Sequence, residues 1–101
     1  MNFHVYLLRC RDGSYYVGHT DNLESRIAQH QQGLVPGWTR SRRPVTLLWS
    51  EAWATRDEAF RNERRLKGWS RAKKEALVRG DYAALVELAR FRTSSDRGEA
   101  S

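Results

Sequence analysis

Cysteine is nearly absent from this sequence. Cys10 is the only one in 101 residues, so no intramolecular disulfide can form, and no Cys/His cluster has the spacing of zinc ligands. These absences exclude a disulfide-stapled scaffold and favour a protein of the reducing cytoplasm. We expect Cys10 itself to be a small buried hydrophobic residue.

Long apolar runs are missing too. The stretch from Phe3 to Leu8 is too short for the core of a signal peptide with its flanks, and far too short to span a bilayer. No long helix sets a Lys/Arg face against a Trp/Phe/Leu face, as a membrane-surface protein would need. The sequence therefore predicts a soluble intracellular protein with no membrane partner.

Positive charge is what the chain has in excess. Its formal net charge is +6 and its pI is about 10.1. Residues 1–80 hold 15 Lys and Arg against 8 Asp and Glu, whereas residues 81–101 hold 3 against 4. The basic charge belongs to the body of the protein, and polyanions are its natural partners.

The length and the 40% hydrophobic content suit one modest core. We expect a single domain over residues 1–91 and a polar, disordered tail over residues 92–101. No internal repeat or linker divides the chain.

Two apolar segments around an Asp-Gly turn predict a β-hairpin. The segment from Phe3 to Leu8 is rich in β-branched, aromatic and aliphatic residues, Asp12-Gly13 supplies the turn, and residues 15–19 return. Gly18, at the far end, suggests a place where backbone or a ligand approaches closely.

A helix over residues 22–32 is predicted next. Asp21 and Glu24 resemble a capping box, and Gly33 is placed to end the helix. A loop follows to Arg43, and residues 45–49 read as a third strand.

This helix carries polar side chains beside its apolar stripe. Leu23 and Ile27 are spaced as a core stripe, and Arg26 and His30 share that spacing and flank it. We expect a cation and an imidazole at the border of the core.

A second capping box, Thr55 with Glu58, begins another helix. Its apolar positions include Phe60 and Leu66, and Glu63 lies within 60° of both, at about 100° of turn per residue. This carboxylate is therefore expected to point toward the core or its rim. Shorter helices are predicted after it, one from a Ser70 cap to about Arg79 and one from Tyr82 to Arg90.

Residues 3–78 resemble the GIY-YIG nucleases, especially the small stand-alone bacterial members. In that family a strand with a Gly-Ile-Tyr motif pairs with a strand with Tyr-Ile-Gly. The matching stretches here are His-Val-Tyr at residues 4–6 and Tyr-Val-Gly at residues 16–18. The tyrosines align, whereas His4 stands in place of the first glycine.

The resemblance implies a catalytic site. It matches Tyr6 and Tyr16 to the two motif tyrosines, Arg26 to the catalytic arginine, and His30 to a histidine one turn later. It matches Glu63 to the metal-binding glutamate. A single carboxylate completed by water suits Mg²⁺ or Mn²⁺ rather than Zn²⁺, and the family implies Mg²⁺.

Phosphodiester hydrolysis explains these residue types. It requires a deprotonated water, stabilised charge on the non-bridging oxygens and a neutralised leaving 3′ oxygen. Tyr6 or Tyr16 would take the proton of the water, with His30 relaying or orienting. Arg26 would hold the phosphoryl oxygens and a cation on Glu63 would meet the leaving group. Because a tyrosine pKa is normally near 10, the site must favour phenolate through the arginine and the metal.

Other basic residues would grip the phosphate backbone, with strong salt dependence and no sequence preference. They are Arg40, Arg42 and Arg43 in the loop, and Arg64, Lys67, Arg71, Lys73 and Lys74 on the helical side.

These residues also have ordinary structural readings. Tyr6 and Tyr16 could be aromatics packing across a hairpin, and Glu63 could simply pair with Lys67 one turn later. Tryptophans such as Trp38 are more often core or rim residues than base-stacking platforms. What favours a site is the order of tyrosines, capped helix and inward acid along the chain.

The sequence therefore predicts an α+β fold, with a small three-stranded antiparallel sheet made of hairpin, helix and third strand, flanked by helices. The predicted function is metal-dependent cleavage of structured DNA in the bacterial cytoplasm, as in repair or recombination, with targeting by DNA shape or a partner protein. The alternative is a non-catalytic DNA- or RNA-binding module, and a tryptophan-docking adaptor is a third reading.

Overall fold

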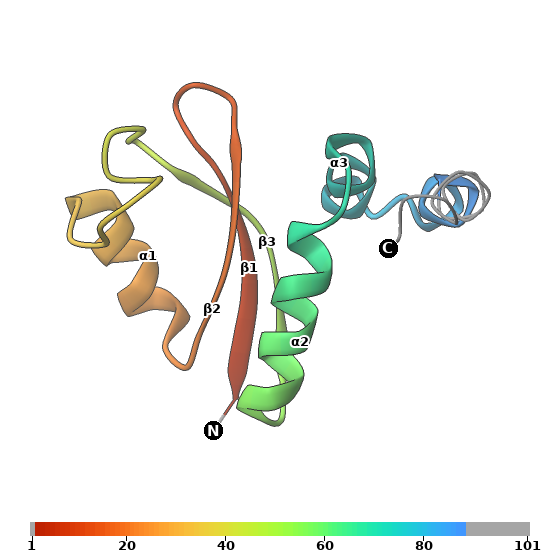
Figure 1. Cartoon of the computed structure of the whole chain (residues 1–101), viewed down its shortest axis with the longest axis horizontal. Helices are drawn as coiled ribbons and strands as arrows, with labels where there is room; N and C mark the ends of the chain where they lie inside the picture. The colour runs from red at the N-terminus through yellow and green to blue at the C-terminus, as the bar shows by residue number, and fades with distance from the viewer. Residues whose placement is uncertain (1, 89–101) are drawn as a thin grey trace. The chain divides into compact units, whose positions relative to one another are not determined.

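The computed structural model describes residues 2–88 (Figure 1). The chain divides into two compact units, Met1–Gly68 and Trp69–Ser101, and each is described by itself. The predicted disordered tail, residues 92–101, lies outside the described residues. The prediction of one domain over residues 1–91 stays a prediction.

The first unit is built on a three-stranded antiparallel sheet. Its strands are β1 (Phe3–Arg9), β2 (Tyr15–Thr20) and β3 (Thr46–Trp53), in the spatial order β2-β1-β3. The predicted α+β fold is confirmed. The third strand is longer than predicted because β3 pairs with β1 along its whole length, from Phe3 opposite Trp53 to Arg9 opposite Thr46.

Helix α1 (Leu23–Gln32) follows the hairpin, and its N-cap corrects the predicted one. Asn22, not Asp21, accepts the hydrogen bond from the amide of Ser25. The hydroxyl of Thr20 accepts from the amide of Asn22, which fixes the chain before the cap and starts the helix one residue later. Gly33 ends the helix in the left-handed region at φ 75°, as predicted.

Helix α2 (Arg56–Lys67) begins at the predicted Thr55–Glu58 capping box, with both reciprocal hydrogen bonds present. Of its predicted inward residues, Leu66 is buried, whereas Phe60 is 44% exposed. Phe60 lies beyond the edge of the buried stripe, so the predicted core role was wrong for this residue.

One helix covers each face of the sheet, α1 on one side and α2 on the other (Figure 1). Tyr6 and Leu8 of β1 pack with Cys10 and Val45, and the α1 residues Leu23 and Ile27 cover this cluster. Since side chains alternate along a strand, the buried residues between them point to the α2 face; these are Val5 and Leu7.

The second unit holds α3 (Arg71–Arg79), which is capped by Ser70 and ends after Arg79 as predicted. Gly80 ends it in the left-handed region. Residues 82–88 are helical, which covers the described part of the predicted last helix. In residues 2–88 no helix is long and apolar enough to cross a membrane.

Candidate active site

The Tyr6 ring lies against the backbone of the neighbouring strand. Tyr6 of β1 is paired with Gly18 of β2, so both face α1. A Cβ added at Gly18 would be 2.5 Å from the Tyr6 Oη and 2.6 Å from its Cζ. Gly18 is therefore required by close approach of the phenol, as the sequence suggested.

The Tyr6 hydroxyl begins a buried chain of hydrogen bonds. Its Oη lies 2.9 Å from His30 Nε2, and His30 Nδ1 lies 2.8 Å from Thr39 Oγ1. All three side chains are at most 1% exposed. His30 thus sits deeper than the predicted core border. Thr39 was missed, because it lies in an irregular loop whose sequence has no periodic pattern to mark it.

Burial keeps both members of the Tyr6–His30 pair neutral. It raises the pKa of Tyr6 to about 12, although the nearby Arg26 lowers it. Burial, with a smaller effect of Arg26, lowers the pKa of His30 to about 4. The protein groups around Tyr6 therefore favour the phenol over the expected phenolate.

Tyr16 and Arg26 stand beside this pair. The Tyr16 ring centroid is 6.4 Å from that of Tyr6 and 5.2 Å from that of His30. The Nη1 of Arg26 donates to Gln29 at 3.2 Å, while its Nε is buried with no partner among the described residues. A buried, unpaired N–H is a site where an anionic oxygen would be stabilised.

Glu63 comes from α2, on the other side of the sheet. It is 7% exposed, which confirms the predicted inward direction. Its Oε2 accepts from Lys67 Nζ at 2.7 Å and its Oε1 pairs with His19 Nδ1. The predicted pairing with Lys67 is therefore present, and His19 is a partner that the sequence analysis missed. The Glu63 carboxylate also contributes to raising the pKa of Tyr6, so the acid acts electrostatically on the opposite face.

The donor set around Glu63 can be compared with what a divalent cation requires. No group of three or more His, Cys, Asp or Glu in the described part of the chain could hold a metal ion. Mg²⁺ keeps several waters and is commonly held by one or two carboxylates, so Glu63 with water fits it. Lys67 and His19 each hold one oxygen of this carboxylate, so a cation would have to displace at least one of them, and the 53% exposed Lys67 side chain can turn into solvent.

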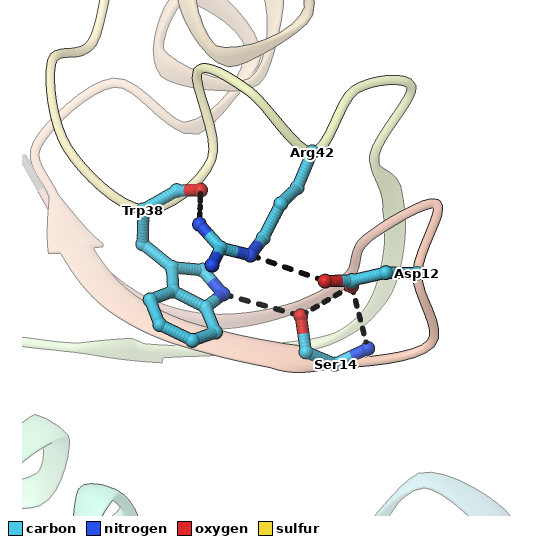
Figure 2. A network of polar contacts seen from close by, with 4 residues as sticks. All are labelled: Asp12, Ser14, Trp38 and Arg42. Atoms are coloured by element: carbon cyan, nitrogen blue, oxygen red, sulfur yellow. Dashed lines mark hydrogen bonds and ion pairs between the residues drawn. The ribbon is translucent and has the colours of Figure 1, made fainter.

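Two of the predicted DNA-binding arginines hold the loop that carries Thr39. Arg42 stacks over the Trp38 ring and bonds to Asp12, as Figure 2 shows. Arg43 donates to the carbonyls of Arg40 and Gln31. Arg40 is exposed.

The helical basic residues are divided between the units. On α2, Arg64 lies 5.6 Å from the Phe60 ring centroid. On α3, Arg71 pairs with Glu75 at 3.1 Å and Lys73 lies over Trp69. Lys74 is the third basic residue of α3 in this predicted set, and burial lowers its pKa. The structure brings Tyr6, Tyr16, Arg26 and His30 together, and none of the α3 residues is placed relative to them.

A sheet that presents one tyrosine from each hairpin strand to a helix with arginine and histidine defines a GIY-YIG catalytic domain. The family model for that domain matches residues 2–76, and this chain belongs to the GIY-YIG family. The predicted family is confirmed.

Two relatives match this chain over most of their own length. A UPF0213 protein from Halobacterium salinarum is 47% identical over 74 residues, covering 73% of this chain and 96% of the relative. A UPF0213 protein from Bacillus pumilus is 43% identical over 77 residues, covering 76% and 79%.

Two solution NMR structures have the same fold. The UPF0213 protein BH0048 from Bacillus halodurans is 41% identical, with a TM-score of 0.52 over 87% of this chain and 97% of that one. The protein EF2693 from E. faecalis is 32% identical, with a TM-score of 0.56 over 82% and 88%.

Proposed function

We propose that this protein is a metal-dependent endonuclease that hydrolyses DNA phosphodiester bonds. The observation that carries the proposal is the buried chain from Tyr6 through His30 to Thr39, with the unpaired Nε of Arg26 beside it. Membership of a nuclease family supports it.

Tyr6 is the general base in this proposal. It takes a proton from the attacking water as its own hydroxyl proton passes to His30 Nε2, which is 2.9 Å away. The low pKa of His30 keeps the imidazole neutral at pH 7, so one ring nitrogen has a lone pair to accept that proton. In this proposal Nδ1–H donates to Thr39 Oγ1, which lies 2.8 Å away, and Nε2 is left as the acceptor.

Arg26 stabilises the charge that develops on the phosphoryl oxygens. Its Nε has no other partner among the described residues, and a charge-assisted bond in a half-buried site is stronger than one in water. Tyr16, whose ring packs against those of Tyr6 and His30, would position the scissile phosphate.

Glu63 would hold the divalent cation, Mg²⁺ or Mn²⁺. When bound, such an ion lowers the pKa of nearby hydroxyls and neutralises the leaving 3′ oxygen.

The proposed substrate is structured DNA, such as a branch, flap or nick, in cytoplasmic repair or recombination. The net charge of +6 supports a polyanionic partner. Arg40 and Arg64, which are exposed residues of the first unit, would contact backbone phosphates. A partner protein would supply any further targeting.

A second function has one observation in its favour. Both oxygens of Glu63 are already held, by Lys67 and by His19, as expected of a structural ion pair. A module that binds DNA or RNA without cleaving it would need no metal ion on Glu63.

The two proposals are separated by incubating the protein with labelled linear, flapped and four-way DNA in Mg²⁺, Mn²⁺ or EDTA. Glu63→Ala tests the metal site, and Glu51→Ala, an exposed acid on β3, is the matched control. Cleavage that disappears in EDTA and in Glu63→Ala but persists in Glu51→Ala supports the nuclease. Equal binding by all three proteins with no cleavage favours the binding module.

A further inference from the structure

Trp38 is the one exposed tryptophan of residues 2–88. Trp38 is 48% exposed, whereas its chain neighbour Thr39 is 1% exposed. The loop thus directs the Thr39 side chain into the candidate active site and leaves Trp38 exposed to solvent. An exposed indole next to a buried catalytic contact calls for an explanation other than core packing.

The indole is held in place by polar contacts (Figure 2). The indole Nε1 donates to Ser14 Oγ at 3.2 Å, and the backbone carbonyl of Trp38 accepts from Arg42 Nη1 at 2.9 Å. The Arg42 guanidinium lies 3.5 Å from the ring centroid, so it covers one face. The exposure of Trp38 therefore belongs mainly to the opposite face. A flat, fixed aromatic face binds with little loss of side-chain entropy.

The charge around the indole is balanced. The Nε of Arg42 donates to Asp12 at 3.1 Å, and hydrogen bonds from Ser14 lower the pKa of Asp12, which keeps it ionised. The guanidinium is thus already matched by a carboxylate. This spot suits a nucleobase, which stacks on a π face, better than a phosphate, which needs unmatched positive charge.

The indole is also tied to the candidate active site by two segments. Thr39 follows Trp38 in the chain and bonds to His30. Ser14, which accepts from the indole, lies two residues before Tyr16. Exposed arginines flank both segments, Arg40 on the loop and Arg11 on the hairpin turn, where a phosphate backbone could reach them.

We propose that Trp38, backed by Arg42, is a stacking platform for an unpaired base of DNA whose backbone enters the candidate active site. The inference rests on the proposed function and deepens it, because it names single-stranded segments as what the protein prefers. Stacking is sequence-tolerant, since every base has a π face. Overhangs and flaps should therefore bind better than blunt duplex, whatever their sequence.

The test uses the full chain in EDTA, so that binding is measured without cleavage. The probes are a duplex with a short single-stranded overhang, carrying 2-aminopurine at an unpaired position, and the same duplex made blunt. Stacking on the indole should quench the 2-aminopurine fluorescence. The wild type should bind the overhang DNA about 5- to 150-fold more tightly than the blunt duplex, the range expected for one stacked base.

Trp38→Leu should abolish the quenching and remove the preference, leaving the affinity for blunt duplex within about twofold. Trp38→Phe should retain part of both. Ser14→Ala is the control for the loop, because it removes the bond to Nε1 but leaves the indole and Arg42. It should keep most of the preference, with thermal unfolding confirming that each variant is folded.

The proposal is overturned if the overhang base is not quenched, or if Trp38→Leu weakens both DNAs equally. It is also overturned if Ser14→Ala loses as much as Trp38→Leu, since the indole would then serve only the loop. Quenching in EDTA without cleavage in Mg²⁺ would support the Trp38 platform and contradict the proposed nuclease activity. Cleavage with no preference for the overhang would support the nuclease activity and contradict the platform.

Discussion

The hydroxyl oxygen of Tyr6 lies 2.9 Å from Nε2 of His30, with both side chains shut off from solvent. Their pKa values are moved in opposite directions by the same burial, up to about 12 and down to about 4. The resting pair is therefore neutral.

Thr39 is predicted to control which nitrogen of His30 carries the proton. Thr39→Val removes the acceptor of Nδ1–H, and a buried unpaired donor costs about 1–3 kcal/mol. The proton then favours Nε2, where it blocks transfer from Tyr6. We expect kcat to fall roughly tenfold or more at unchanged KM, with most of the rate restored in Thr39→Ser.

Single-turnover cleavage and the ¹⁵N shifts of the imidazole measure this effect. The shifts should show the tautomer change in Thr39→Val and the original tautomer in Thr39→Ser. Valine and serine variants that share both the wild-type rate and the wild-type tautomer would remove Thr39 from the mechanism.

Gly18→Ala is predicted to damage both stability and activity. Its methyl would be 2.5 Å from Tyr6 Oη, so the ring must move away from His30, at a cost of about 1–3 kcal/mol. Urea unfolding and cleavage rates measure the two effects. Gly68→Ala is the control, because the nearest atom to its added Cβ is 3.6 Å away. Equal stability of the two variants would contradict the close approach.

Lys67 is predicted to compete with the divalent cation for Glu63. Lys67→Met frees Oε2, which now accepts at 2.7 Å. Because the lysine is half exposed, the gain is modest: the Mg²⁺ concentration for half-maximal cleavage should fall about two- to fivefold. Arg61→Met removes the same charge from an exposed position of α2 and should leave that concentration unchanged.

The assay for Lys67 is run at saturating DNA, so that lost phosphate attraction does not mask the metal effect. Mn²⁺ binding followed by electron paramagnetic resonance gives the same comparison without cleavage. A Lys67→Met protein that needs more metal than the wild type would place the cation elsewhere.

His30 is predicted to make the protein less stable in mild acid. Burial lowers its pKa from 6.5 to about 4. Between these two pH values His30 is therefore protonated in the unfolded chain and neutral in the folded chain. Stability is then complete above about pH 6.5 and is lost as the pH falls toward 4, by about 3 kcal/mol in all. Urea unfolding from pH 7 to pH 4.5 measures this loss.

His30→Gln supplies the control for acid unfolding. Glutamine keeps hydrogen-bonding groups at this position but does not titrate. The difference in unfolding free energy between the two proteins should shrink as the pH falls. A constant difference across the range would mean that His30 is protonated equally in both states.

Local structure could be predicted well because it depends on residues a few positions apart. The Thr55–Glu58 capping box formed as expected, and Gly33 ended α1 as expected. The shift of the α1 cap from Asp21 to Asn22 came from Thr20, a third competing side chain. Where several cap-forming residues adjoin, sequence alone does not rank them.

The candidate site was predictable only in part. The order of tyrosines, arginine, histidine and glutamate along the chain was sufficient to indicate the GIY-YIG family, whose domain model matches residues 2–76. The roles of Tyr6, Tyr16, Arg26, His30 and Glu63 remain proposals that the experiments above address.

The sequence by itself determined the hairpin, the helices and the family, because hydrophobic period, caps and turn residues act over short range. Pairing with β1 decided the length of β3. Only the tertiary structure decided that Thr39 bonds to His30 and that His19 bonds to Glu63. Those partners are 9 and 44 residues apart, and they meet through strand register and the docking of a helix on each face. The same long-range packing sets the dielectric around Tyr6 and turned Trp38 toward solvent, which no local pattern encodes.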